Sequence, residues 1–315
     1  MSATVSPPQN DATAATAAAT TTVGPAAAGA GPADVRGAVA RRPRRRRVER
    51  KPVAAIGFTV FFFVVFYLPI VVVALFSLNS RKSLTVFGGF SLRWYDEFIH
   101  SSDLLGSLAM SLRVSLVAMV GSVLLGVALA LGMVRARSKL GSFAGFIMLI
   151  PLVTPEIVTG VASQMLFTGL GIALSQGTVM LAEITFSISY VTVILRSRVA
   201  AMNPELEEAA MDLGATRWQA LRLVTLPALL PAILASAVLV FALVFDDFVL
   251  ANFTTGVHPQ PLPVTIYSQI RNGVRPTINA VGTVMLVGSI GLIALAMVIP
   301  RFFGRRGGLD ILSGD

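Results

Sequence analysis

Residues 203–227 read NPELEEAAMDLGATRWQALRLVTLP and separate two long apolar segments. Asn203 and Pro204 are typical of a helix start, as N-cap and first helical residue, with acidic residues in the first turn. An apolar stripe follows at helical spacing, formed by Leu206, Ala209, Ala210 and Leu213. Gly214 is suited to the left-handed conformation that ends a helix, and Thr216 to capping a second one. The stretch therefore predicts a surface helix over 203–214 with one apolar face.

Composition places this helix in a membrane protein. The chain has 315 residues, of which 55% are apolar and 13% charged, with a mean hydropathy of +0.77. Soluble domains carry about 25% charged residues, so this chain has too few to cover a surface that faces water. The absence of Cys and the presence of only two His exclude disulfides, thiolate ligands and a histidine-built metal site. We expect no metal site.

Long apolar segments predict an all-α, polytopic membrane protein. A bilayer core about 30 Å thick requires about 20 apolar residues per helix. By this measure the sequence predicts six transmembrane helices, near residues 53–78, 105–134, 143–170, 178–195, 229–255 and 279–300.

Three regions follow from these segments and from the distribution of charge. Residues 1–52 are an Ala/Thr/Pro-rich tail, predicted to be disordered, and a polybasic segment; residues 53–305 hold the six spans, and 306–315 form a short tail. With the N-terminus inside, 19 of the 25 Lys and Arg lie in cytoplasmic segments and 5 in external ones. This bias predicts that both termini are cytoplasmic. It explains the net charge of +9 without binding to nucleic acid.

The loop over 203–227 resembles the EAA loop of ABC importer permeases. The resemblance rests on the spacing of Glu208-Ala209-Ala210, Gly214 and Leu226-Pro227, with Val224 where the family has Ile. It implies the type I ABC importer permease fold, in which this loop forms a cytoplasmic coupling helix seated in a groove of a separate ATPase. The residues that it assigns to ATPase coupling are Glu207, Glu208, Ala209, Ala210, Asp212, Leu213 and Gly214.

The same resemblance implies the partners. The chain has no P-loop motif, so we expect ATP to be bound and hydrolysed by the partner, and this chain to be no enzyme and to hold no cofactor. We expect a dimer of ATPase subunits, a second permease subunit in a heterodimer, and an extracytoplasmic substrate-binding protein. The expected location is the plasma membrane of a prokaryote.

Charged residues inside the spans indicate the cargo, because such residues are costly and usually face a path or the bundle interior. Glu156, Asp246 and Asp247 are the candidate path residues and favour a cationic cargo. Two structural alternatives stay open. Arg113 and Asp246 lie at matching depths and could form an ion pair, and Glu156 could bind backbone donors freed by a proline kink. Glu183 lies so near the end of its segment that we expect it to face water.

Residues 245–256 and 262–280 resemble segments of Pot-type spermidine/putrescine permeases, and among these the second permease subunit. This resemblance implies a polyamine cargo, whose ammonium groups suit a lane of separated carboxylates. A permease for iron(III) or thiamine is the alternative, because related subfamilies share the fold. A stand-alone secondary carrier is a further alternative, but no clear repeat relates 53–170 to 178–300.

Overall fold

The computed structural model describes residues 53–83, 85–135, 139–257, 259–273 and 275–304. The predicted tail and polybasic segment over 1–52 and the C-terminal tail over 306–315 lie outside the described residues. The packing discussed below is that of residues 55–315, which form one unit. Within the described ranges the regular structure is helical, apart from one isolated antiparallel bridge between Asn79 and Phe90.

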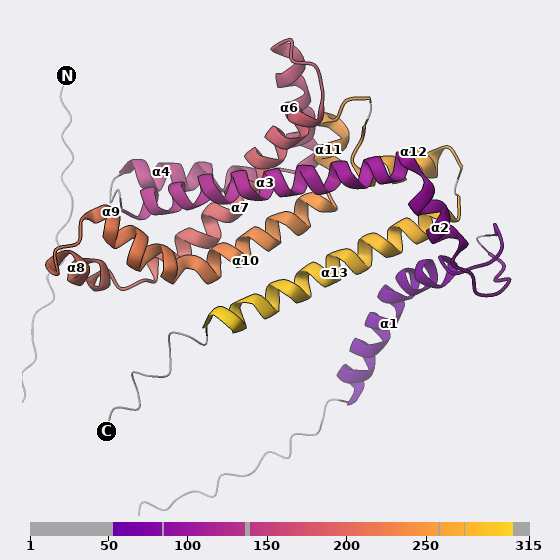
Figure 1. Ribbon diagram of the computed structural model, residues 1–315, viewed down its shortest axis with the longest axis horizontal. Coiled ribbons are helices and arrows are strands. Elements are labelled where there is room, and N and C mark those ends of the chain that lie inside the picture. Colours follow the sequence, from indigo (N-terminus) through magenta and orange to yellow (C-terminus); the bar gives the residue numbers. More distant parts are fainter. Residues whose placement is uncertain (1–52, 84, 136–138, 258, 274, 305–315) are drawn as a thin grey trace, which may run out of the picture. The chain divides into compact units, whose positions relative to one another are not determined.

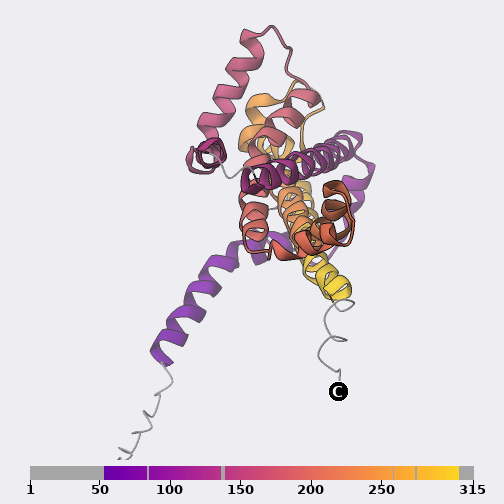
Figure 2. The same ribbon diagram turned by 90° about the vertical axis from the view of Figure 1, so that its left-hand side faces the viewer.

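The central helices pack through small residues. Helices α3 (Ser102–Arg135), α7 (Gln176–Ala200) and α10 (Leu226–Phe245) contact one another, and α13 (Thr277–Gly304) packs on α10 (Figures 1 and 2). The α3–α7 contact is the most extensive, because glycines let the backbones approach. A Cβ built on Gly126 would lie 2.6 Å from Cγ1 of Val191, and one on Gly121 would lie 2.9 Å from Cδ1 of Ile184.

The first span and the next helix differ in burial. Helix α1 (Val53–Phe76) is apolar all round, and residues 56–73 are exposed along its whole circumference. Helix α2 (Arg93–His100) has one buried side, on which the Trp94 indole Nε1 donates a hydrogen bond of 2.6 Å to the Asn79 carbonyl. An apolar helix exposed on every side is suited to lipid or to another membrane subunit.

The third predicted span is broken. Residues 143–170 form α4 (Lys139–Ile147), α5 (Ile150–Val153) and α6 (Glu156–Gly169), and the segments before and after the break meet at 105°. Thr154 is extended, with ψ 132°, because the following Pro155 disfavours the helical conformation before it. The apolar segment predicted over 143–170 is therefore present as a bent pair of helical segments, with the break next to Pro155, where the sequence allows a proline kink.

The fifth predicted span begins earlier and ends sooner than expected. Helix α9 (Arg217–Ala220) continues through a π-helix, Leu221–Thr225, into α10, so one helical run covers Arg217–Phe245. The chain then leaves the helix at Asp246 and begins the short α11 (Val249–Thr254). The predicted helix over 229–255 is thus interrupted at its acidic pair.

Helix α12 (Leu262–Arg271) is fixed to α3 by serines. The Ser111 hydroxyl accepts a hydrogen bond of 2.8 Å from the Leu262 amide, and the hydroxyls of Ser107 and Thr265 lie 2.8 Å apart. These buried contacts satisfy polar groups that would otherwise be costly in an apolar bundle.

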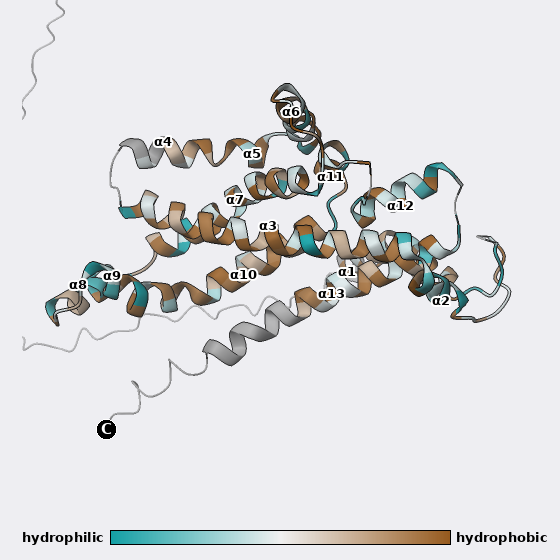
Figure 3. Cartoon of the chain, turned by 45° about the horizontal axis from the view of Figure 1, so that its top comes forward, coloured by the Kyte–Doolittle hydropathy of each residue, from teal (hydrophilic) through white to brown (hydrophobic). Residues whose placement is uncertain are grey.

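Five described helices are long and apolar enough to cross a membrane, or up to six if the bent pair over 143–169 counts as one span. This agrees with the six predicted spans and with an all-α polytopic fold. Hydrophilic residues gather on α8 (Glu205–Asp212) and α9, and again around α2, while the helices between are mainly hydrophobic (Figure 3).

Candidate functional site

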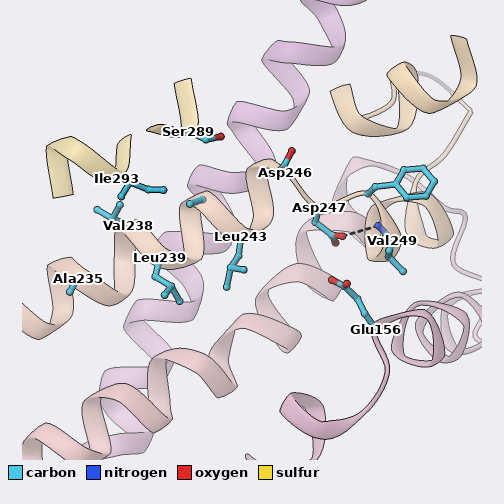
Figure 4. Close-up of a pocket in the computed structure, with 12 residues that line it drawn as sticks. Glu156, Ala235, Val238, Leu239, Leu243, Asp246, Asp247, Val249, Ser289 and Ile293 are labelled. Atoms are coloured by element: carbon cyan, nitrogen blue, oxygen red, sulfur yellow. Dashed lines mark hydrogen bonds between the residues drawn. The ribbon is translucent and has the colours of Figure 1, made fainter. Parts of the chain in front are cut away.

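The break after α10 carries two adjacent carboxylates with different surroundings. Asp247 Oδ1 accepts a hydrogen bond of 2.8 Å from the Val249 amide, so it caps the first turn of α11. Figure 4 shows the Asp247 and Glu156 side chains pointing toward one another, while Asp246 points away from them. The two carboxylates of the acidic pair therefore face different sides of the break.

A wide, mostly apolar cavity of about 970 Å³ opens beside this break. The three carboxylates predicted to line a substrate path, Glu156, Asp246 and Asp247, all lie on its wall. Its remaining lining comes mainly from α10, with Ser289 and Ile293 of α13 (Figure 4). The structure thus brings together the three candidates at one apolar cavity.

A smaller recess of about 200 Å³ adjoins two of these carboxylates. Glu156 and Asp247 line it together with Glu183 of α7. Glu183 is only 2% exposed, and its Oε1 atom has no hydrogen-bond partner among the described residues. The expectation that Glu183 faces water is therefore wrong.

Glu183 lies on α7, which contacts α3, α10 and α11. Where α11 meets α7, the Thr178 hydroxyl donates a hydrogen bond of 2.7 Å to the Thr254 carbonyl. One signal in the sequence does point to Glu183. Glu183, Ser187 and Tyr190 follow at intervals of four and three, form one polar face of α7, and all line the recess.

Arg113 does not pair with Asp246. Neither ion pair found among the described residues includes Arg113 or Asp246. Arg113 is exposed on α3, whereas the next two residues, Val114 and Ser115, face the core. The depths of two residues in the bilayer do not determine how each helix is rotated about its own axis. The rotation of α3 directs Arg113 away from the bundle. The predicted ion pair is therefore absent from this structure.

The helix predicted over 203–214 is present with shifted bounds. Helix α8 covers Glu205–Asp212, and the Asn203 side-chain oxygen accepts a hydrogen bond of 3.1 Å from the Glu205 amide. Gly214 has φ +92°, the left-handed conformation expected at the helix end. Thr216 caps α9 together with Gln219, as its position predicted.

The residues that the resemblance assigns to ATPase coupling are mostly exposed, and only Glu207 and Ala210 among them are half-buried. The full set is Glu207, Glu208, Ala209, Ala210, Asp212, Leu213 and Gly214. Apolar side chains on this surface include Leu206, which is 54% exposed, and Leu213, which is 90% exposed. Glu207 differs from the rest of the set, because it pairs with Arg135 and accepts a hydrogen bond of 2.6 Å from Thr225. Where the structure is described, no three His, Cys, Asp or Glu side chains are placed to hold a metal ion.

Comparison with known proteins agrees with this architecture. The chain is 38% identical over 242 residues to the putrescine transport system permease protein PotI of Escherichia coli, covering 74% of this chain and 86% of that protein. It is 32% identical over 245 residues to the spermidine/putrescine transport system permease protein PotC of the same organism, covering 78% and 93%.

Solved structures show the same fold. A bacterial ABC transporter for import of the polysaccharide alginate matches with a TM-score of 0.64 at 15% identity, covering 81% of this chain and 95% of that chain. The MetNI methionine ABC transporter matches with a TM-score of 0.53 at 18% identity, covering 64% and 94%. Residues 122–306 match the family model described as binding-protein-dependent transport system inner membrane component. The chain therefore belongs to the family of inner membrane components of binding-protein-dependent transport systems.

Proposed function

We propose that the chain is a permease subunit of an ATP-driven polyamine importer and forms half of its translocation path. The observation that carries this proposal is the set of Glu156, Asp246 and Asp247 on the wall of one apolar cavity, in a chain 38% identical to a putrescine permease. Carboxylates in an apolar wall attract cations, and the apolar lining suits the methylene chain between ammonium groups. The proposed cargo is therefore putrescine or spermidine.

Helix α8 is the proposed docking element for an ATPase subunit. Its exposed apolar residues Leu206 and Leu213 lie beside three glutamates of its first turn, which oppose contact with an anionic membrane surface and favour a protein groove. In this proposal α8 and both termini are cytoplasmic, and ATP is bound only by the partner. A second permease subunit and an extracytoplasmic substrate-binding protein complete the importer.

The test is uptake of radiolabelled putrescine and spermidine by cells with and without this gene. Uptake should disappear with the gene and return with the intact copy. A Gly214→Asp copy should restore little uptake, because the variant strains the end of α8 while leaving the carboxylates in place. Unchanged polyamine uptake in the deletion strain would contradict the proposed cargo. Full uptake with the Gly214→Asp copy would contradict the role of α8.

A further inference from the structure

The recess beside the wide cavity contains an unpaired carboxylate oxygen. Glu183 is 98% buried, since only 2% of its surface is exposed, and its Oε1 atom lacks any hydrogen-bond partner in the described part of the chain. A buried carboxylate oxygen without a hydrogen-bond partner is costly. The same side chain lines the recess, so the missing partner has space to enter.

The other walls of the recess suit an alkylammonium group. Glu156 and Asp247 supply two further carboxylates, and Phe186 and Tyr190 supply aromatic rings whose centroids lie 5.4 Å apart. Ammonium groups bind to carboxylates and to the faces of aromatic rings. The volume of about 200 Å³ is several times the roughly 30 Å³ that one water molecule occupies. The recess is therefore large enough for an ammonium head and its first methylene groups.

We infer that Glu183 is a cargo-contacting residue, and that the recess formed by Glu156, Glu183 and Asp247 binds one terminal ammonium group of the cargo. This inference rests on the proposed function for the identity of the cargo. Asp246 lies on the wide cavity but not on the recess, and it lies with Tyr267 on the wall of a third cavity. A cargo with two ammonium groups thus has one end at Glu183 and the other near Asp246.

The first experiment compares putrescine uptake by cells that carry the assembled importer with wild-type chain, Glu183→Gln or Thr192→Val. Glu183→Gln keeps the size of the side chain and removes its charge, so KM should rise about tenfold or more with the loss of one charge-assisted contact. Thr192→Val is the matched control. Thr192 is 1% exposed on the same helix, and its Oγ1 atom also lacks a partner among the described residues, but it lies outside the recess. Its KM should equal that of the wild type.

A second experiment needs no variant and no transport. Dicyclohexylcarbodiimide modifies buried carboxyl groups, and its attachment to Glu183 can be followed by peptide mass spectrometry of the purified complex. Putrescine should protect Glu183 from modification, whereas butanol, which has a similar chain but no ammonium group, should give no protection. Protection by neither compound would overturn the inference.

The outcomes separate the two proposals. If the wild type takes up putrescine and Glu183→Gln has an unchanged KM, the recess does not bind the cargo and the proposed function stands. If the wild type takes up no polyamine, the proposed cargo is wrong, and the labelling experiment still decides whether the recess binds an alkylammonium group. A matching rise of KM in Thr192→Val would also overturn the inference, because it would assign the effect to disturbed packing of α7.

Discussion

Glu207 of α8 accepts a hydrogen bond of 2.6 Å from Thr225, the last residue of the π-helix that leads into α10. The same carboxylate pairs with Arg135, the last residue of α3. One side chain thus joins α8 to two helices of the bundle. In the proposed importer, movement of α8 by an ATPase would reach α3 and α10 through this carboxylate.

Glu207→Gln should uncouple ATP hydrolysis from transport. The variant removes the charge that binds Arg135, and hydrogen bonds to charged groups contribute about 1.5–3 kcal/mol when well shielded. Because Arg135 and Glu207 are 41% and 29% exposed, solvent screening lowers the expected contribution to about 1 kcal/mol or less. Transport per ATP hydrolysed should fall several-fold in reconstituted vesicles. Glu205→Gln is the control, since the Glu205 side chain bonds only to the neighbouring Asn203 among the described residues, and it should keep the wild-type ratio.

Gly214→Ala should destabilise the end of α8 through backbone conformation alone. No atom lies within 4 Å of a Cβ built there, so the side chain fits, but φ is +92°. Left-handed backbone costs a non-glycine residue about 1–2 kcal/mol. Less ATPase should copurify with this variant. Gly132→Ala has equal space and an ordinary helical backbone, and should copurify the normal amount. Equal losses from both variants would contradict this explanation.

Gly126→Ala should lower the thermal stability of the purified complex. The added Cβ would lie 2.6 Å from Val191 Cγ1, and overpacking of this kind costs about 1–3 kcal/mol. Val191→Ala in the same chain should recover part of the loss, because it frees the space. Gly106→Ala, on the same helix with nothing within 4 Å, should leave the melting temperature unchanged or raise it. A melting temperature unchanged by Gly126→Ala would mean that α3 and α7 are less close than described.

Two variants of Asp247 should separate its charge from its capping role. Asp247→Asn keeps an oxygen for the Val249 amide, so it should reduce polyamine uptake while the complex assembles in normal amount. Asp247→Ala also removes the cap, and should cost about 1 kcal/mol of stability in addition. The two measurements are uptake and the melting temperature of the complex. The charge has no role in transport if Asp247→Asn and the wild type take up putrescine equally.

Local chemistry allowed the sequence to predict the spans and the surface helix near 203–214. Gly214 and Thr216 have their predicted roles, and Asn203 binds the Glu205 amide although the helix begins one residue later than predicted. Hydropathy likewise located all six apolar segments, because segment length alone decides whether a helix can cross the membrane.

The burial of Glu183 and the orientation of Arg113 depend on how the helices pack, which the sequence alone did not predict. Glu183 shares its recess with Glu156, Val244 and Asp247, which come from distant parts of the sequence. The alternative that Arg113 pairs with Asp246 rested on depth alone, and rotation about the axis of α3 directs Arg113 elsewhere. Depth in the bilayer specifies neither the rotation of a helix about its axis nor the residue at which the helix ends. Pro155 and Asp247 mark the two breaks, at 154–155 and 246–248.

The π-helix over Leu221–Thr225 determines how far α10 is rotated about the helix axis relative to α9. It adds a residue to a turn, so α10 is rotated by about 100° relative to the continuation of an unbroken α-helix from α9. Deleting one residue from this turn would restore regular α-helix and turn the Asp246–Asp247 end about its own axis, while α9 kept its position. A single-residue deletion would therefore re-align the acidic end of this helix relative to α9.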